Sequence, residues 1–258
     1  MDIEKIKQAG IAAAFESGRI LRSKFGNITS IVKKGRIDLV TEADTASEKA
    51  VIDTIHSCFP SHSILAEESG LFSGDSRYQW IIDPLDGTTN FAHALPLFST
   101  SIAFSEDNVI KMGIVHNPIL GELFSAVEGA GAFFNGKKIH VSQKNNLFDC
   151  LLVTGFPYNN KEKMQEIMTR FSNCLEAAQG VRRLGSAALD LCYVACGRFD
   201  GYWEQNLKPW DTAAGQLIAK EAGAFVTDFS NNPFDIAMAE ILATNGDIHG
   251  EMLTLLRL

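Results

Sequence analysis

Trp80 to Phe91 reads WIIDPLDGTTNF, an apolar strand that runs directly into two aspartates. Pro84 favours an extended backbone at Asp83, so this carboxylate can leave the strand tip while Asp86 turns back toward the same cavity. Gly87 permits a tight turn, and the N–H groups after it can open toward an anion as a helix N-terminus does. The stretch therefore predicts a strand end where two carboxylates and an anion site face one cavity.

Taken alone, this stretch also fits an Asx-type turn with a Thr88 cap. Two further acids bear on the choice. Glu67 follows the apolar run Ser63 to Ala66, and Asp211 begins an Ala-rich helix. Singly, Glu67 fits a solvated strand terminus and Asp211 fits a helix N-cap. Each of them again places an acid at the end of an element.

Taken together, these acids predict a metal site made only of oxygen ligands, the type that Mg²⁺ or Mn²⁺ prefers. The expected ligands are Glu67, Asp83, the Leu85 carbonyl, Asp86 and Asp211. Zinc is less suited, because the six histidines have no ligand spacing. We expect His93, His116 and His140 at the surface or in loops.

Outward from this stretch, Phe98 to Phe134 alternates β-rich runs with turn signals and predicts an antiparallel meander. Upstream, apolar spacing predicts a helix from about Ile3 that ends at Gly26, and a second helix over Thr45 to Cys58 with Asp44 near its start. Between them, Ile31 to Val40 reads as two short extended segments around a polar turn, KKGR.

The second half alternates helical and extended patterns, which together with the meander predicts an α+β fold. The expected helices cover 161–178, 186–196, 212–222 and 248–256, and the expected strands are LLVTGF, FDGYWE and ILATN. No repeat or long linker interrupts the chain. We expect one domain over residues 1–258, with possible subdomains of about 1–145 and 146–258.

Composition narrows the functional class. The chain has 258 residues, of which 46% are hydrophobic, so it can bury a sizeable core. A net charge of −8 and a pI near 5.3 do not indicate nucleic-acid binding. Acids gathered in one cleft would attract divalent cations instead.

The cysteines and the chain start indicate the compartment. Five cysteines without C-x-x-C spacing, and a start (MDIEKIKQAG) without an apolar stretch, predict reduced thiols in a cytoplasmic protein. Cys192 and Cys196 are expected to be buried small hydrophobes rather than ligands. No run approaches the roughly 18 apolar residues of a membrane span.

The ordered acids lie within longer stretches that resemble the inositol monophosphatase family. The two long signatures are WIIDPLDGTTNFAHALP (Trp80 to Pro96) and PWDTAAGQLIAKEAGAFVTD (Pro209 to Asp228). The resemblance extends over nearly the whole chain through LVTEAD (39–44), AEES (66–69), TGFPY (154–158) and RRLGSAALDLCYVACGRFDGYWE (182–204). It implies a layered αβαβα sandwich, a homodimer, inhibition by lithium and about two or three Mg²⁺ ions per site.

The resemblance also implies roles for residues. Asp83 would bridge two metals, Glu67 and Thr88 would orient the attacking water, and Thr88 would pair with Asp44. The expected substrate contacts are Leu85, Asp86, Gly87, Thr88, Gly185, Ser186, Ala187, Glu204 and Asp211. Without the resemblance, Gly185 to Ala187 would read as a helix start and Glu204 as a strand-end charge.

The implied activity is hydrolysis of myo-inositol 1-phosphate or a related sugar phosphate. Related branches share the metal acids, so fructose 1,6-bisphosphate and 3′-phosphoadenosine 5′-phosphate remain alternative substrates. A non-catalytic regulatory or protein-binding module is an alternative of another class. The intact set of Glu67, Asp83, Asp86, Thr88 and Asp211 argues against it.

Overall fold

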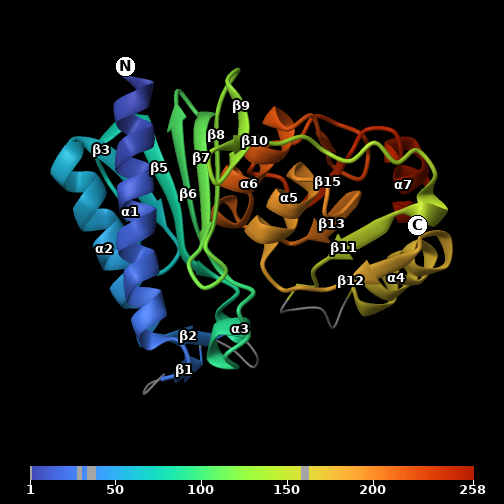
Figure 1. The fold of residues 1–258 in the computed structure, drawn as a ribbon, viewed down its shortest axis with the longest axis horizontal. Coiled ribbons are helices and arrows are strands. Elements are labelled where there is room, and N and C mark those ends of the chain that lie inside the picture. The colour runs from blue at the N-terminus through green and yellow to red at the C-terminus, as the bar shows by residue number, and fades with distance from the viewer. Residues whose placement is uncertain (1, 28–30, 34–38, 158–162) are drawn as a thin grey trace.

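The computed structural model describes residues 2–27, 31–33, 39–157 and 163–258. Figure 1 shows the arrangement of its helices and strands. The helices are α1 (Ile3–Lys24), α2 (Glu42–Cys58), α3 (Thr88–Ala92), α4 (Met164–Ala177), α5 (Ala187–Ala195), α6 (Pro209–Glu221) and α7 (His249–Leu256), with a 3₁₀ turn at Leu147–Asp149. Strands β1 (Ile31–Lys33) and β2 (Leu39–Thr41) form a small antiparallel pair.

The larger sheet has eight strands and carries the predicted meander. Its order is β10-β9-β8-β7-β6-β5-β3-β4. The strands are β3 (His62–Ala66), β4 (Gly70–Phe72), β5 (Asp75–Asp86), β6 (Ser99–Glu106), β7 (Val109–Asn117), β8 (Glu122–Val127), β9 (Gly131–Phe134) and β10 (Lys137–Lys138). All neighbours pair antiparallel except β3 and β5, which run parallel. The carboxyl ends of β3 and β5 therefore meet at one edge.

The smaller sheet has five strands in the order β12-β11-β13-β15-β14. These are β11 (Leu151–Thr154), β12 (Gly180–Arg182), β13 (Gly201–Gln205), β14 (Phe225–Thr227) and β15 (Glu240–Thr244). Strand β11 runs parallel to both β12 and β13, whereas β15 runs antiparallel to β13 and β14.

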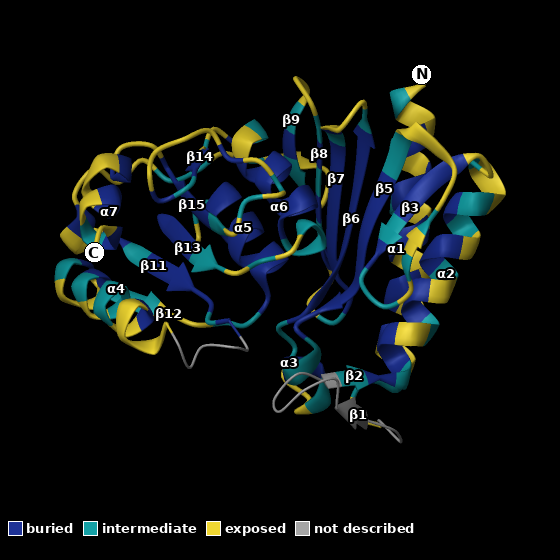
Figure 2. Cartoon of the chain, turned by 180° about the vertical axis from the view of Figure 1, so that it is seen from behind, coloured by how far each residue is buried: buried dark blue, intermediate teal, exposed yellow. Residues whose placement is uncertain are grey.

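Five layers follow from the way the apolar faces pack. Helices α1 and α2 cover the outer face of the large sheet, α5 and α6 fill the space between the sheets, and α4 and α7 cover the outer face of the small sheet (Figure 1). Figure 2 shows the consequence: α5 and α6 are almost wholly buried, whereas α1, α2 and α4 each expose one side. The predicted α+β fold, a layered αβαβα sandwich, is confirmed.

Helix α6 packs unusually close to its neighbours because two glycines make room for it. A Cβ atom on Gly113 in β7 would lie 2.6 Å from the carbonyl oxygen of Ala214. A Cβ atom on Gly215 would lie 2.8 Å from the Leu191 side chain of α5. The backbone of α6 therefore rests directly on the centre of the large sheet and on α5, which leaves its first turn little freedom to shift.

Several local predictions needed correction. Helix α2 begins at Glu42, not near Thr45, because Thr41 caps it and Asp44 completes the capping box from inside the first turn. His116 is 2% exposed, not on the surface, and its Nδ1 lies 2.9 Å from the Ala14 carbonyl of α1. Strands β12 and β14 were not predicted, because each has only three residues. Such a short segment shows no alternation of apolar and polar side chains.

Other predictions concern residues that are only partly described. The turn at Lys33 to Arg36 and the start of the 161–178 helix extend into segments outside the described residues.

All five cysteines are free thiols. Within the described ranges, no helix combines the length and apolar character needed to cross a bilayer.

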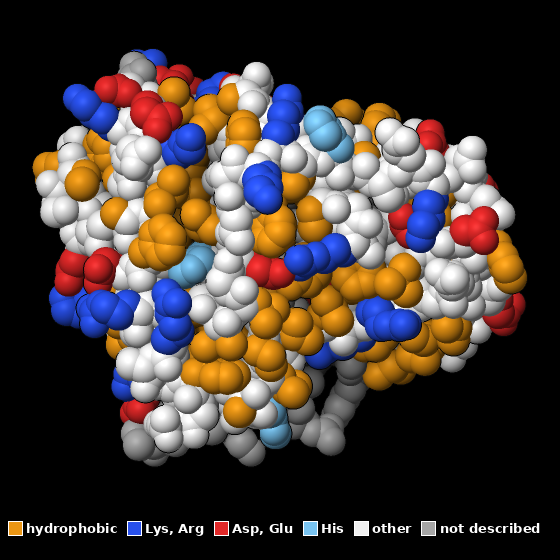
Figure 3. Space-filling view, in the orientation of Figure 1, with side chains coloured by type: hydrophobic (Ala, Val, Ile, Leu, Met, Phe, Trp, Pro, Cys, Tyr) orange, Lys and Arg blue, Asp and Glu red, His pale blue; other side chains and the backbone are white. Residues whose placement is uncertain are grey.

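On the face drawn in Figure 3, basic and acidic side chains are interspersed with apolar ones.

Candidate active site

The parallel pair β3 and β5 brings Glu67 beside Asp83. Ala66 is the register partner of Ile82, and the Glu67 N–H donates to the Ile82 carbonyl at 3.2 Å. The next residue on each strand is an acid, and parallel strands end at the same edge. Two carboxylates separated in sequence therefore lie at neighbouring strand ends.

Asp86 is reached through a break in the regular ladder of β5, where the register with β6 shifts between Asp83 and Asp86. Its carboxylate lies at the beginning of α5. The Ser186 hydroxyl donates to Oδ2 at 2.6 Å, and the Ala188 N–H donates to the same oxygen at 2.8 Å. A helix N-terminus favours a negative charge, so α5 holds Asp86 in place.

Asp211 comes from the first turn of α6, on the other side of the same cavity. The Lys208 N–H donates to its Oδ2 at 2.7 Å. One turn of backbone is thereby closed, with Pro209 in the first turn, where a missing N–H costs nothing. Because α6 rests on the sheet, Asp211 is fixed relative to β5.

Thr88 and Asp44 form a pair behind these acids. The Thr88 hydroxyl lies 3.0 Å from both Asp44 Oδ1 and the Leu85 carbonyl, so its single proton is shared between two acceptors. Asp44 is buried and also accepts from the Thr41 N–H at 2.7 Å. The hydrogen bond between Thr88 and Asp44 that the family resemblance implies is present.

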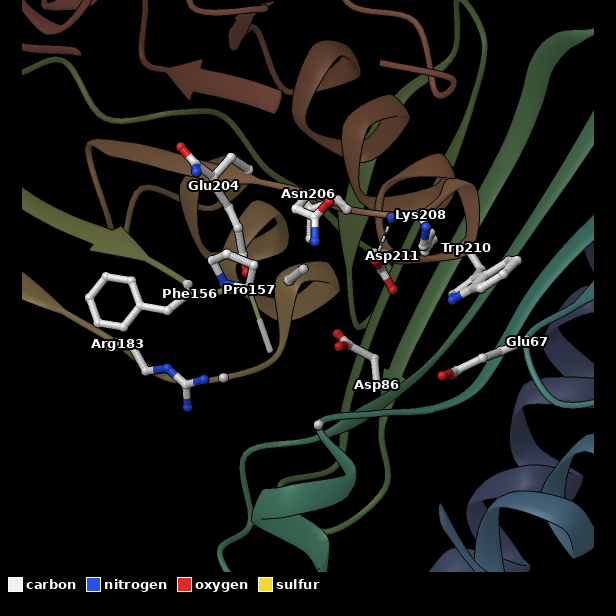
Figure 4. Close-up of a pocket in the computed structure, with 16 residues that line it drawn as sticks. Glu67, Asp86, Phe156, Pro157, Arg183, Glu204, Asn206, Lys208, Trp210 and Asp211 are labelled. Carbon is white, nitrogen blue, oxygen red and sulfur yellow. Dashed lines mark hydrogen bonds between the residues drawn. The ribbon is translucent and has the colours of Figure 1, made fainter. Parts of the chain in front are cut away.

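A cavity of about 400 Å³ opens where these elements meet. Its lining consists of Glu67, Asp86, Gly87, Gly155, Phe156, Pro157, Arg183, Gly185, Ala187, Glu204, Gln205, Asn206, Leu207, Lys208, Trp210 and Asp211. In Figure 4 the carboxylates of Asp86 and Asp211 point into one space that Glu67 approaches from the side, while Arg183 lies at the opposite end. Asp83, at 2% exposure, lies buried behind them.

The predicted substrate contacts divide into two groups. Gly185, Ala187 and Glu204 line the cavity together with Asp86, Gly87 and Asp211. Ser186 does not line it, because its hydroxyl is turned to Asp86 and the residue is 1% exposed. Leu85 and Thr88 also lie outside the lining, directly behind it.

Gly87 has a backbone role that no other residue can fill easily. Its φ is 98°, and a Cβ atom there would lie 3.0 Å from the Leu97 carbonyl and 3.2 Å from the Gly185 carbonyl. The turn from β5 into α3 therefore requires glycine both for its left-handed conformation and for space.

Burial dominates the electrostatics of the acid cluster, and repulsion among the carboxylates adds to it at Asp83 and Asp211. Burial raises the pKa of Asp83 well above its ordinary value, and repulsion by Glu67, Asp86 and Asp211 raises it further. Burial likewise raises the pKa of Asp86 to about 6 and the pKa of Asp211 well above its ordinary range. Ionising these carboxylates together raises the free energy of the folded protein unless a cation neutralises their charge.

These residues fit Mg²⁺ by charge and by donor type. Hard divalent cations bind carboxylate and carbonyl oxygens. A bound cation would also relieve the repulsion among the buried acids. In the described part of the chain, no group of three or more His, Cys, Asp or Glu side chains lies in an arrangement that could hold a metal ion as the side chains are oriented here. The fit to Mg²⁺ therefore rests on the charge and the donor type of these residues.

Sequence reasoning missed the hydroxyls that hold the Pro84 carbonyl. Ser47 of α2 donates to this oxygen at 2.9 Å and Thr100 of β6 donates at 3.2 Å. The Ser17 hydroxyl of α1 lies within hydrogen-bonding distance of both of these hydroxyls, and its single proton can be donated to one of them. No spacing in the sequence links the three side chains, since they come from different elements.

Comparison with known proteins agrees with the geometry. The sequence profile of the inositol monophosphatase family matches residues 2–257. The chain is 44% identical over 253 residues to an inositol-1-monophosphatase from Synechocystis sp., covering 97% of this chain and 88% of that protein. It is 43% identical to a Nus factor SuhB from Haemophilus influenzae, covering 96% and 94%.

A solved structure extends the likeness to the whole fold. The inositol monophosphatase from Anabaena is 42% identical and superimposes with a TM-score of 0.90 over 99% of this chain and 96% of that chain. Sequence, fold and clustered acids all agree with this family. The chain therefore belongs to the inositol monophosphatase family, and it is a phosphatase.

Proposed function

We propose that this phosphatase is a Mg²⁺-dependent phosphomonoesterase and that its substrate is myo-inositol 1-phosphate. The observation that carries the proposal is that Glu67, Asp86 and Asp211, which come from three different elements, line one cavity with Asp83 buried behind them. Such a concentration of buried negative charge suits metal-assisted hydrolysis of a phosphate ester.

In this proposal Glu67, Asp83, Asp86, Asp211 and the Leu85 carbonyl would hold two or three Mg²⁺ ions, and Mn²⁺ could take their place. Asp83 would serve more than one of these ions. Bound ions supply positive charge to the phosphate oxygens and to the leaving oxygen, and they make water more acidic.

Thr88 and Asp44 have a defined part in orienting the water. When the Thr88 hydroxyl donates to Asp44 Oδ1, its oxygen retains lone pairs that can accept a hydrogen bond from water. Glu67, which lines the cavity, accepts the other proton of that water. The water is then oriented with a free lone pair toward phosphorus.

The remaining lining residues bind the substrate. The Gly87 and Thr88 N–H groups bind the phosphate at the part of the cavity wall that Gly87 lines. Gly185 and Ala187 form a wall without long side chains beside the inositol ring. Glu204 accepts hydrogen bonds from the ring hydroxyls.

The test is phosphate release by purified protein at fixed Mg²⁺ from three substrates: myo-inositol 1-phosphate, fructose 1,6-bisphosphate and 3′-phosphoadenosine 5′-phosphate. We expect the inositol ester to give the highest kcat/KM. A strong preference for either bisphosphate would overturn the substrate assignment. EDTA should abolish release and added Mg²⁺ should restore it; hydrolysis that resists chelation would overturn the metal dependence.

A homodimer and lithium inhibition stay predictions from the family resemblance, and a cytoplasmic location stays a prediction from the cysteines and the first residues. The SuhB relative from Haemophilus influenzae bears the name of a Nus factor. A purely non-catalytic role for the present chain is disfavoured because its acids are all retained.

A further inference from the structure

The carboxylate of Glu204 occupies the space that a side chain at position 155 would fill. A Cβ atom on Gly155 would lie 2.0 Å from Oε2 and 2.1 Å from Oε1 of Glu204. The two residues follow neighbouring parallel strands, since Thr154 of β11 is the register partner of Trp203 of β13. Only glycine at 155 leaves room for the Glu204 side chain in its observed position.

A second contact fixes the same carboxylate. The Tyr202 hydroxyl donates to Glu204 Oε2 at 2.8 Å. Residues 202 and 204 share one face of β13, because side chains alternate along a strand. Tyr202 is fully buried in the core between the two sheets, so its ring cannot move to follow a displaced partner.

The ends of the two strands are also fastened to each other. The Thr154 hydroxyl donates to the Trp203 carbonyl at 2.6 Å, one residue before both Gly155 and Glu204. The distance between the backbones at 155 and 204 is therefore fixed. A side chain at 155 would displace the carboxylate rather than spread the strands.

We propose that Gly155 and Tyr202 are positioning residues for Glu204, and that through it they make the enzyme favour phosphate esters of polyols over esters without hydroxyls. The inference rests on the proposed hydroxyl-binding role of Glu204. A polyol phosphate gains binding free energy from the fixed carboxylate, because its hydroxyls donate hydrogen bonds to it. An aryl phosphate without hydroxyls gains nothing from it.

The direct test is Gly155→Ala, assayed with Mg²⁺ on myo-inositol 1-phosphate and on p-nitrophenyl phosphate. The backbone of Gly155 is outside the left-handed region and the collision is with the end of a flexible side chain, so the variant should fold. We expect KM for the inositol ester to rise about tenfold, as for loss of hydrogen bonds to a charged group, with kcat much less affected. KM for the aryl ester should change less than twofold.

Tyr202→Phe provides an independent arm that adds no atoms. It should raise KM for the inositol ester by roughly threefold to fivefold and leave KM for the aryl ester within twofold, because only the contact to Oε2 is removed. A rise in KM for both esters, or for neither, in both variants would overturn the proposal.

A double-variant comparison separates positioning from general damage. In a Glu204→Ala background, Gly155→Ala should have no further effect on KM, because the carboxylate it displaces is gone. A further tenfold rise in KM in that background would show that position 155 acts on binding by another route and would overturn the proposal. Gly250→Ala in α7 is the matched control, since a Cβ atom there meets nothing within 4 Å.

Failure of the underlying function gives a different result. If the unaltered protein releases phosphate from neither ester in Mg²⁺, the proposed function falls and this inference falls with it. If it hydrolyses both esters but Gly155→Ala and Tyr202→Phe fail to discriminate between them, the proposed function stands and only the positioning role is lost.

Discussion

The two ends of the cavity are constructed in different ways. At the acid end, Asp83 and Asp86 lie three residues apart in one strand, and Glu67 lies at the end of the strand beside it. At the hydroxyl end, Glu204 depends on Gly155, which is far away in sequence and contributes only by lacking a side chain. Three of the four acids that every phosphate ester needs therefore come from one stretch, residues 67–86, and only Asp211 comes from far away, whereas substrate discrimination depends on tertiary neighbours.

The largest expected effect comes from removing the central charge of the acid end. Asp83→Asn should lower kcat on the order of 10³-fold for inositol and aryl esters alike, because every substrate needs the same cation. The pKa of the Asp83 carboxyl is raised in the folded protein, so its ionised form destabilises the metal-free fold at neutral pH. The free energy of unfolding of the variant should therefore be no lower than that of the unaltered protein. Steady-state kinetics and urea unfolding measure both effects.

The exposed change Asp53→Asn on α2 is the control for this experiment, and it should alter neither quantity. Retained Mg²⁺-dependent turnover in Asp83→Asn would contradict the role of Asp83. A large loss on one ester only would contradict the division of the cavity into a shared end and a discriminating end.

Ser186 is the residue that can break the comparison, because it comes from the second half of the chain yet holds Asp86 at the acid end. Ser186→Ala removes the donor to Asp86 Oδ2, so the Mg²⁺ concentration for half-maximal activity should rise about tenfold. Loss of the α5 N-cap should also cost about 1 kcal/mol of unfolding free energy.

Mg²⁺ titration of activity, with thermal unfolding beside it, measures both consequences of Ser186→Ala. Ser105→Ala in β6 is the matched control. It also removes a buried serine hydroxyl, but the acceptor of that hydroxyl is the Gln79 carbonyl rather than Asp86. An unchanged Mg²⁺ requirement would show that the acid end needs no support from α5.

The smallest effect on activity is expected from His249 of α7, which lies against the small sheet, away from both ends of the cavity. His249 is buried between Thr227 and Thr244, and burial lowers its pKa to about 4. The Thr227 hydroxyl donates to the Asp228 carbonyl, so the ring donates from Nε2 and accepts at Nδ1 from Thr244. A proton on Nδ1 would remove that last hydrogen bond.

Because the pKa falls from 6.5 on folding, the stability from neutral His249 is present above about pH 6.5 and is lost as pH falls toward 4. Between pH 7 and pH 4.5 the loss should be about 2 kcal/mol. His249→Gln should show a correspondingly weaker pH dependence in urea unfolding, while the exposed His140→Gln should match the unaltered protein. Equal pH dependence in all three would contradict the assignment.

Much of the fold could be predicted from local signals. Alternation from Phe98 to Phe134 indicated the meander correctly, and helical spacing located the main helices. The start of α2 was misjudged because Thr41 and Asp44 are both good N-cap residues, and only the structure shows which one caps. His116 was misjudged because its burial depends on α1, about a hundred residues away.

The acid end could also be predicted, since carboxylates after apolar strands are visible in the sequence. The supporting residues could not. Ser17, Ser47 and Thr100 read as ordinary helix and strand residues until the fold brings them to the Pro84 carbonyl. Gly155 carries no chemical group at all, so its role exists only in relation to Glu204.

The position of α5 and α6 between the sheets also bears on how the protein is made. The inner face of the large sheet, which includes Ile81, Val115 and Phe124, is buried beneath these two helices. A ribosome synthesises the whole large sheet before it reaches α6. During that interval an apolar face is uncovered, and such faces favour aggregation. The nascent chain therefore has its greatest need of chaperone protection just before residues 187–221 emerge.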